Sequence, residues 1–250
     1  MEETAAIPGS AIFALILESV PRLVLPFLLF HFWRKRTKAA YLPALIGMAV
    51  FIVVIPVKNL LMKSFGLEDT PWVYYILSAS LAGVFEECGR YFAFRKPLRN
   101  YDDRKHCISY GIGHGAVECM VSGYLSFQQL IVALWINGGG QDKSVEMLAD
   151  SHPLVSVIFF LNSAMTFVFH IALSVVVFAA ARKLNGRKYL FAAIAFHAVS
   201  DILIAFRYMG KLEGLDLFLL DLPITAVLCY VAWFIYRELP SFDEGLSMDC

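Results

Sequence analysis

The sequence has little charge. Only 17% of its 250 residues are Asp, Glu, Lys or Arg, whereas 59% are hydrophobic. A soluble domain carries about 25% charged residues, so this chain has too little polar surface to cover a water-soluble globule. The mean hydropathy of +0.65 agrees with this conclusion. We therefore expect a lipid bilayer to be the solvent for most of the chain, with membrane lipid as its main partner.

Several familiar signals are absent. The formal net charge is zero, so the excess of basic residues that accompanies nucleic-acid binding is missing. The five cysteines form no CxxC pair and no zinc-ribbon spacing. The zinc-protease motif HExxH is also absent. The first ten residues, MEETAAIPGS, are acidic rather than basic, so we expect no cleavable signal peptide.

Long apolar runs fill most of the chain instead. A membrane-spanning helix needs about 20 mainly apolar residues. Prolines 71 and 153 lie in the first turn of two such runs, where the missing N–H costs nothing. We predict an all-α, polytopic membrane protein, a single seven-helix transmembrane domain over residues 1–250, with one sizeable loop at 136–151. The predicted spans are residues 11–33, 39–62, 72–94, 108–135, 153–181, 189–206 and 215–236.

Basic residues predict the orientation of these spans. Cytoplasmic loops of membrane proteins carry an excess of Lys and Arg. The loops after the first, third and fifth spans, together with the C-terminal tail, hold 14 basic residues, and the opposite side holds four. We therefore predict that the N-terminus lies outside and the C-terminus in the cytoplasm.

Ionisable residues inside the spans are candidates for a functional site, because a charge at membrane depth is costly. At 1.5 Å per residue, Glu86 and three histidines lie roughly 10–18 Å from the predicted cytoplasmic ends of their helices. Four helices of alternating direction thus place a proton-handling group at one depth, and we expect these groups to meet. The candidate set is Glu86, Glu87, Arg90, His114, Glu118, His170, His197 and Asp201.

Spacing within each helix suggests pairs, because residues four apart share a face. Arg90 would then compensate the charge of Glu86. Glycines 111, 113 and 115 would let the helix of His114 pack closely beside the helix of Glu86. A separate pair, Glu18 with Arg22, would be structural or line a cavity. The candidate-site pairs with this spacing are Glu86–Arg90, His114–Glu118 and His197–Asp201.

These residue types allow three kinds of chemistry. Three histidines with carboxylates can bind zinc from separate helices. Without a metal, a glutamate can activate water while histidines bind the oxyanion. A proton-coupled transporter would use the same residues, although we find no internal repeat of the kind common in transporters. We expect the four middle helices to enclose a water-filled cavity open toward the cytoplasm.

Three short motifs resemble those of a known superfamily. The segment EECGR (86–90) resembles the first motif, EExxxR, of the CAAX protease and bacteriocin-processing superfamily. YGIGH (110–114) resembles its FxxxH motif, and HAVSD (197–201) its HxxxN motif. The ordered set is most similar to the YhfC family of intramembrane proteases, regarded as glutamic-type and earlier as metallo-type. The order and topology also resemble the anterior-pharynx-defective subunit of γ-secretase.

The resemblance implies hydrolysis of a membrane-associated peptide or protein in a multi-pass membrane protein, in a bacterial inner membrane. It places the catalytic core at 72–206. Glu86 would be the general base that activates water, supported by Arg90 and Glu87. His114 and His197 would position the water or stabilise the oxyanion. We accordingly expect no cofactor and no metal ligand.

Departures from the motifs leave two alternatives. Asp201 stands where relatives carry asparagine, and the first motif is one residue shorter. His170 and Glu118 enlarge the set, which makes a zinc-dependent version of the same protease conceivable. A non-catalytic scaffold that binds partner membrane proteins is the other alternative, by analogy with the γ-secretase subunit.

Overall fold

A computed structural model describes residues 6–67, 69–183 and 186–241, and every regular element in these ranges is a helix. The prediction of an all-α chain is therefore confirmed. Each predicted span coincides with one long helix, while the predicted loop at 136–151 contains an additional short helix. The helices are α1 (Gly9–Thr37), α2 (Tyr41–Ser64), α3 (Pro71–Arg95), α4 (Lys105–Asn137), α5 (Val145–Ala149), α6 (Pro153–Arg182), α7 (Arg187–Tyr208) and α8 (Gly214–Arg237).

Among the described residues, six helices are long and apolar enough to cross a membrane. They are α1, α2, α4, α6, α7 and α8. The remaining long helix, α3, carries Glu86, Glu87 and Arg90 in its interior, which lowers its apolar character. The seven-span count is thus confirmed for six helices and stays a prediction for α3.

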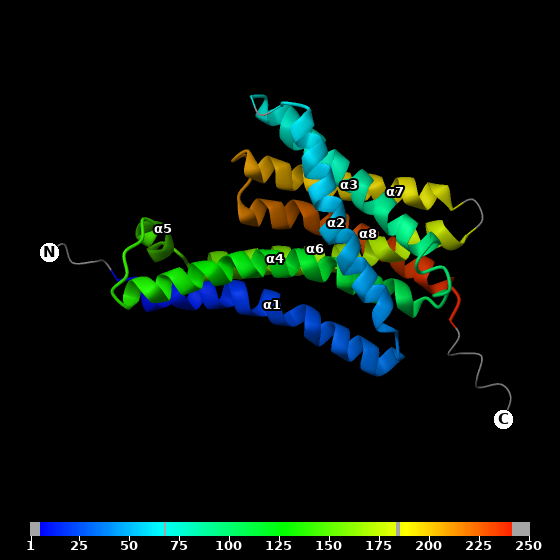
Figure 1. Ribbon diagram of the computed structural model, residues 1–250, viewed down its shortest axis with the longest axis horizontal. Helices are drawn as coiled ribbons and strands as arrows, with labels where there is room; N and C mark the ends of the chain where they lie inside the picture. Colours follow the sequence, from blue (N-terminus) through cyan, green and yellow to red (C-terminus); the bar gives the residue numbers. More distant parts are fainter. Residues whose placement is uncertain (1–5, 68, 184–185, 242–250) are drawn as a thin grey trace.

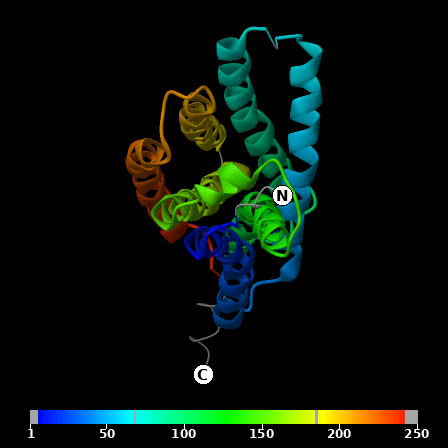
Figure 2. The ribbon, with the colours of Figure 1, turned by 90° about the vertical axis from the view of Figure 1, so that its left-hand side faces the viewer.

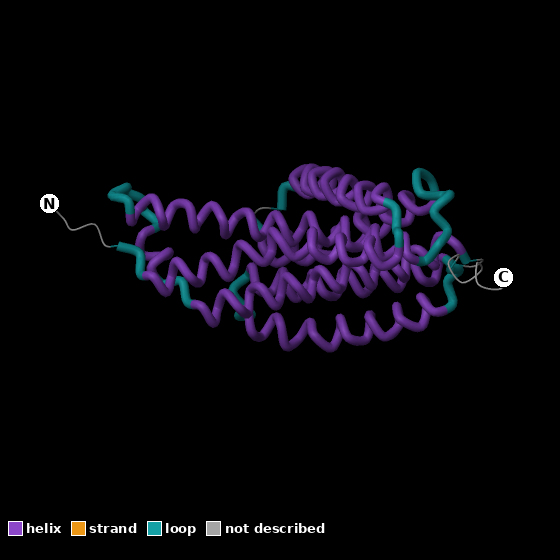
Figure 3. Tube along the Cα trace, turned by 90° about the horizontal axis from the view of Figure 1, so that it is seen from below, coloured by secondary structure: helices purple, strands orange, loops and turns teal. Residues whose placement is uncertain are grey.

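Helix α6 is the centre of the bundle. It contacts α1, α3, α4, α7 and α8, and 78% of its most apolar stretch is buried. By contrast, only 11% of the corresponding stretch of α2 is buried. Helix α2 crosses α4 obliquely and rises with α3 as a hairpin (Figures 1 and 2). The long helices follow the long axis of the molecule when seen from below (Figure 3).

A hydrophobic cluster closes the end of the bundle that the basic loops occupy. Phe94 of α3 packs against Tyr110 of α4 and Phe178 of α6. Arg182, at the end of α6, donates hydrogen bonds to the carbonyl oxygens of Phe94 and Leu98. These contacts tie α6 to the turn that follows α3. The aromatic side chains fill the space between Glu86, Glu87 and Arg90 and the end of the bundle that carries the basic loops.

The glycines of α4 do not face α3 as expected. A Cβ atom at Gly113 would overlap the backbone of Ala44 in α2. At Gly111 the nearest atoms belong to Ile171 and Ser174, so this glycine faces α6. Residues two apart lie on nearly opposite sides of a helix. Gly113 and Gly111 therefore allow α4 to approach two different helices, α2 and α6. Helix α4 is thereby held tightly between α2 and α6.

We expect Gly113→Ala to destabilise the protein. Overpacking of this kind costs ~1–3 kcal/mol, because neither backbone can move without repacking. Gly89→Ala is the matched control, since its Cβ would meet only the ends of Val50 and Val54 at 3.0 Å. There the gain in helix propensity, about 1 kcal/mol, offsets a small shift of two valines. Thermal unfolding in detergent, followed by tryptophan fluorescence, measures both. Equal melting temperatures for the two variants would contradict the close α2–α4 contact.

Candidate functional site

Four helices bring the predicted site residues together. Glu86, Glu87 and Arg90 come from α3, His114 and Glu118 from α4, His170 from α6, and His197 and Asp201 from α7. Six of these eight are buried, the exceptions being Glu118 and Asp201. The expected convergence of Glu86 with the three histidines is confirmed. Their roles in catalysis stay predictions.

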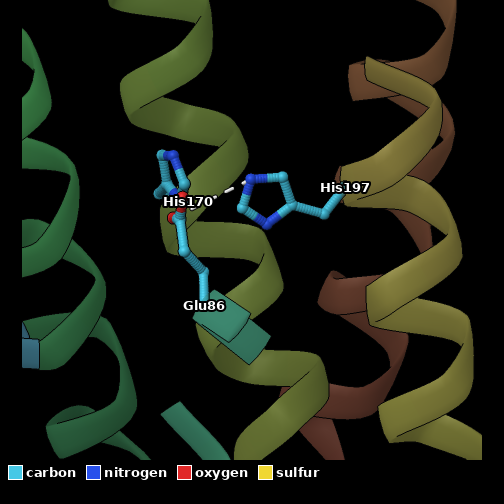
Figure 4. Close-up of side chains that lie close together, drawn as sticks. All are labelled: Glu86, His170 and His197. Carbon is cyan, nitrogen blue, oxygen red and sulfur yellow. Dashed lines mark ion pairs between the residues drawn. The ribbon is translucent and has the colours of Figure 1, made fainter. Parts of the chain in front are cut away.

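Glu86 lies at the centre of the cluster. Nε2 of His114 lies 3.0 Å from Oε2 of Glu86, a hydrogen bond from ring to carboxylate. Nε2 of His197 lies 3.8 Å from the same oxygen. Figure 4 shows Glu86 between the rings of His170 and His197, with its ion pair to His197 dashed. One carboxylate oxygen thus meets histidines from two other helices.

Arg90 is fully buried and links α3 to α6. Its guanidinium pairs with Oε2 of Glu87 at 3.2 Å and donates to Nδ1 of His170 at 3.0 Å. The ion pair of Arg90 is therefore with Glu87, three residues earlier, rather than with Glu86 as expected. Arg90 also donates to the carbonyl oxygen of His170 at 3.4 Å.

His170 bridges Arg90 and Glu118. Its Nε2 lies 2.6 Å from Oε2 of Glu118, so Glu118 bonds across to α6 and not to His114 one turn away. A guanidinium can only donate, so Nδ1 of His170 accepts and its proton lies on Nε2. The side chain of Glu118 is 34% exposed, whereas that of His170 is 3% exposed. Glu118 is therefore the member of this chain of hydrogen bonds that reaches open space.

His197 is oriented by two carboxylates. Its Nδ1 donates to Oε1 of Glu87 at 2.7 Å, which leaves Nε2 directed at Glu86. Asp201, one turn on, lies 3.6 Å from Nε2, so this i, i+4 pair forms as expected. A carboxylate on the far nitrogen is the usual partner of a metal-binding histidine, because it fixes the tautomer and the ring.

Three of these residues form a set suited to a metal ion. Glu86, His170 and His197 each offer one ligand atom, and these atoms lie within 4.8 Å of one another. Two histidines and one carboxylate are a donor set of catalytic zinc sites. Glu87 accepts a hydrogen bond from Nδ1 of His197 and so holds the ring with its Nε2 toward the other two ligand atoms. For His170 to bind a metal through Nδ1, the bond from Arg90 must give way; to bind through Nε2, its proton must move to Nδ1, and the bonds to both Glu118 and Arg90 are then lost. The residues therefore fit a divalent metal.

A cavity of about 320 Å³ leads to this cluster. It is lined by α2, α3, α4 and α7, with Glu86, Glu118 and Asp201 at its inner end. Tyr74 and Tyr208 line it near the start of α3 and the end of α7. The basic-residue count assigns these helix ends to the outside. Aromatic packing fills the opposite end, so the cavity reaches the helix ends away from the basic loops. The side of the membrane on which it opens stays a prediction, together with the orientation of the chain.

Sequence reasoning missed one polar residue of this cavity. Lys58 of α2 lines it and donates to Oγ of Ser78 at 3.2 Å. It was detectable as an ionisable residue inside the second apolar run. The lysine adds a positive charge to a cavity whose inner end is otherwise carboxylate.

A second cavity, of about 200 Å³, also reaches Glu118. Arg22 lines this cavity, and its Nη1 lies 3.4 Å from Oε1 of Glu18. The pair is therefore both a structural ion pair and part of a cavity lining, the two roles expected of it. Glu18 also accepts hydrogen bonds from Ser126 and Ser156. It thereby links α1, α4 and α6 beside the cavity.

Comparison with known proteins places this site in a family. Residues 22–217 match the family described as YhfC intramembrane metalloprotease. A Bacillus subtilis (strain 168) protein described as "Uncharacterized membrane protein YhfC" is 34% identical over 70 residues. That alignment covers 28% of this chain and 27% of the relative's length, far less than two thirds of it. No solved structure matches.

These findings correct two predictions. The expectation of no cofactor and no metal is wrong, because the family is described as a metalloprotease and Glu86, His170 and His197 form a possible metal-binding triad. That expectation followed from the resemblance to glutamic-type proteases, whereas the possible ligand atoms here come from three separate helices. The glutamic type of mechanism is likewise not supported, and the zinc-dependent alternative fits better. The similarity to CAAX proteases and to the γ-secretase subunit stays a prediction.

The match and the apolar helices agree on the class of protein. The matched region includes all eight candidate residues and most of the helical bundle. Six apolar helices make the chain a multi-pass membrane protein. It belongs to the YhfC family of intramembrane metalloproteases.

Proposed function

We propose that this chain is a metal-dependent intramembrane protease that hydrolyses a membrane-associated peptide or protein. One observation carries the proposal. Glu86, His170 and His197 direct ligand atoms to within 4.8 Å of one another, although they are buried and come from three helices. Burying such groups in a membrane protein is expensive unless they serve a function. The cavity lined by Tyr74 and Glu118 would admit the substrate to them.

The remaining side chains prepare this site for hydrolysis. When bound, a divalent metal supplies a Lewis acid that activates water and polarises a carbonyl group. His114 holds the carboxylate of Glu86 through a 3.0 Å hydrogen bond. Glu87 fixes the ring of His197, and Arg90 fixes that of His170. Their effect is to keep three ligand side chains from turning away from one another.

Glu118 is the residue best placed to carry protons. It touches His170 at 2.6 Å, yet a third of its side chain is exposed to the cavities. A general base must reach both the reacting water and solvent, and Glu86 is only 3% exposed. We assign to Glu118 the acceptance of a proton from water and its return to the leaving amine. Asp201 lies across the same cavity as a second acceptor.

We also propose that α3 is the seventh span and that the N-terminus lies outside, in a bacterial inner membrane. The polar residues of α3 turn inward, as Glu86, Glu87 and Arg90 are all buried. Apolar side chains of α3 are exposed at the surface, among them Val84 and Phe92, as lipid-facing residues of a span would be. The domain would then cover residues 1–250, with its catalytic core at 72–206. Residues 1–5 and 242–250 lie outside the described ranges, so the structure does not bear on whether the domain includes them.

Metal content provides the first test. We expect the purified protein, supplied with zinc and then desalted, to retain about one ion per chain, because it offers one His₂Glu donor set. His197→Ala removes a ligand and should retain at least ~10-fold less at the same free zinc concentration. His31→Ala is the matched control, since His31 is an exposed histidine far from the cluster in sequence. Elemental analysis measures all three. Equal zinc in His197→Ala and the parent would refute the ligand assignment.

Glu118→Gln tests the proton-carrying role. The amide keeps the shape of the side chain but cannot accept the proton from water. We expect hydrolysis of a dye-quenched peptide library in detergent to slow by at least ~100-fold, while the zinc content stays near that of the parent. Ser122→Ala, which changes another residue of the second cavity, should lower the rate less than ~3-fold. Full activity in Glu118→Gln would remove it from the mechanism, whereas lost zinc would make it a ligand.

Labelling of single cysteines tests the orientation. In a variant without the native cysteines, Lys143→Cys should react with a membrane-impermeant maleimide on intact cells. Lys188→Cys should react only after the cells are opened, because its loop belongs to the basic, cytoplasmic side. Both lysines are exposed, Lys143 in the loop before α5 and Lys188 in the first turn of α7. The opposite labelling pattern would invert the topology.

A further inference from the structure

A basic pocket lies where α1 ends and α2 begins. It has a volume of about 350 Å³ and is lined by His31, Arg34, Lys35 and Lys38, together with three aromatic residues. The guanidinium carbon of Arg34 stacks 3.9 Å from the ring centre of Tyr41, which fixes one cation at its edge. No acidic residue lines this pocket, and within the described ranges Arg34, Lys35 and Lys38 form no ion pair. The pocket therefore has an uncompensated positive charge.

An apolar slot continues from this pocket between α1, α2 and α4. It has a volume of about 210 Å³ and shares Phe27, Phe30 and Tyr41 with the basic pocket. Its floor consists of buried residues, which are Pro26, Ala44, Ile112, Gly113 and Ala116. These floor residues include Ala44, Gly113 and Ala116, whose small size leaves room for the slot. Gly113 and Ala44 also bring α4 and α2 into close contact.

The walls of the slot face the lipid. Phe27, Tyr41 and Leu45 are 61%, 55% and 57% exposed, and Met48 and Met120 complete the lining. From Lys38 to Pro26 the two cavities extend about 18 Å along α1. Trp33 lies at this level and donates to the carbonyl oxygen of Lys105, as an aromatic residue of the membrane interface would. A positively charged pocket at one end and an apolar slot at the other are complementary to an anionic amphiphile.

We propose that the basic pocket and the apolar slot together bind one anionic glycerophospholipid. Its phosphate would lie among Arg34, Lys35 and Lys38, and one acyl chain would fill the slot beside Leu45 and Met48. Four cationic or protonatable side chains without a carboxylate match an anionic headgroup, which basic residues at a membrane surface attract. A soluble phosphate would leave the slot empty. None of the lining residues belongs to the proposed catalytic set, so the inference does not depend on protease activity.

Lipid retention in native mass spectrometry tests the proposal. The full chain in detergent is mixed with dioleoyl phosphatidylglycerol or with dioleoyl phosphatidylcholine, which share acyl chains and differ in headgroup charge. We expect one phosphatidylglycerol to be retained at concentrations at which phosphatidylcholine is lost. Arg34→Gln should weaken retention about fivefold. The control Arg36→Gln removes a cation from the same turn that lines neither cavity, and it should have less than half that effect.

Met48→Trp tests the slot separately from the charge. The indole would occupy space meant for the acyl chain, so we expect phosphatidylglycerol retention to fall at least ~5-fold with folding intact by circular dichroism. Unchanged retention in this variant would overturn the slot assignment. Equal retention of the two lipids would overturn the headgroup assignment. Displacement of the lipid by millimolar glycerol phosphate would indicate a site for a free anion and would also overturn the proposal.

Discussion

The burial of Arg90 constrains the rest of the structure. A guanidinium at the centre of a membrane helix costs about 2.5–3.5 kcal/mol even on the lowest scales, and no water is available to solvate it. Arg90 is fully buried, and its two terminal nitrogens reach Glu87 and His170 inside the protein. Glu87 in turn accepts a hydrogen bond from Nδ1 of His197. One costly cation thereby fixes the positions of α3, α6 and α7 and orients two histidines.

This arrangement separates almost completely buried side chains from side chains that reach a cavity. Glu86, His170 and His197 are almost completely buried, which suits ligands that must stay in place. Glu118 is bonded to His170 but opens to two cavities, which suits a group that exchanges protons. Membership in the YhfC family of intramembrane metalloproteases agrees with such a division, since metal binding favours rigid donors and hydrolysis needs water. Both requirements are met within one cluster.

The sequence predicted the helices and the depth of the polar residues well, because both depend on chain-local properties. Apolar length and the prolines at α3 and α6 locate the helices, and counting residues from the basic loops places Glu86 level with the histidines. It could not predict partners across helices. Spacing paired Arg90 with Glu86 and Glu118 with His114, whereas packing pairs them with Glu87 and His170. The metal triad depends on how α3, α6 and α7 pack against one another, and the cavity on how α2 packs beside α3, α4 and α7. Spacing along one helix carries neither arrangement.

Helix α2 connects the site to the thickness of the membrane. One face of α2 is bathed in lipid along most of its length, and the other supplies Phe51, Ile55 and Lys58 to the cavity beside Glu86. A helix adjusts its tilt when its apolar length differs from that of the bilayer. The central helix α6 is shielded from that adjustment, and α2 is not. A thinner or thicker bilayer would therefore change the width of the cavity beside Glu86 while leaving Glu86, His170 and His197 in place, so the shape of this cavity would depend on membrane composition.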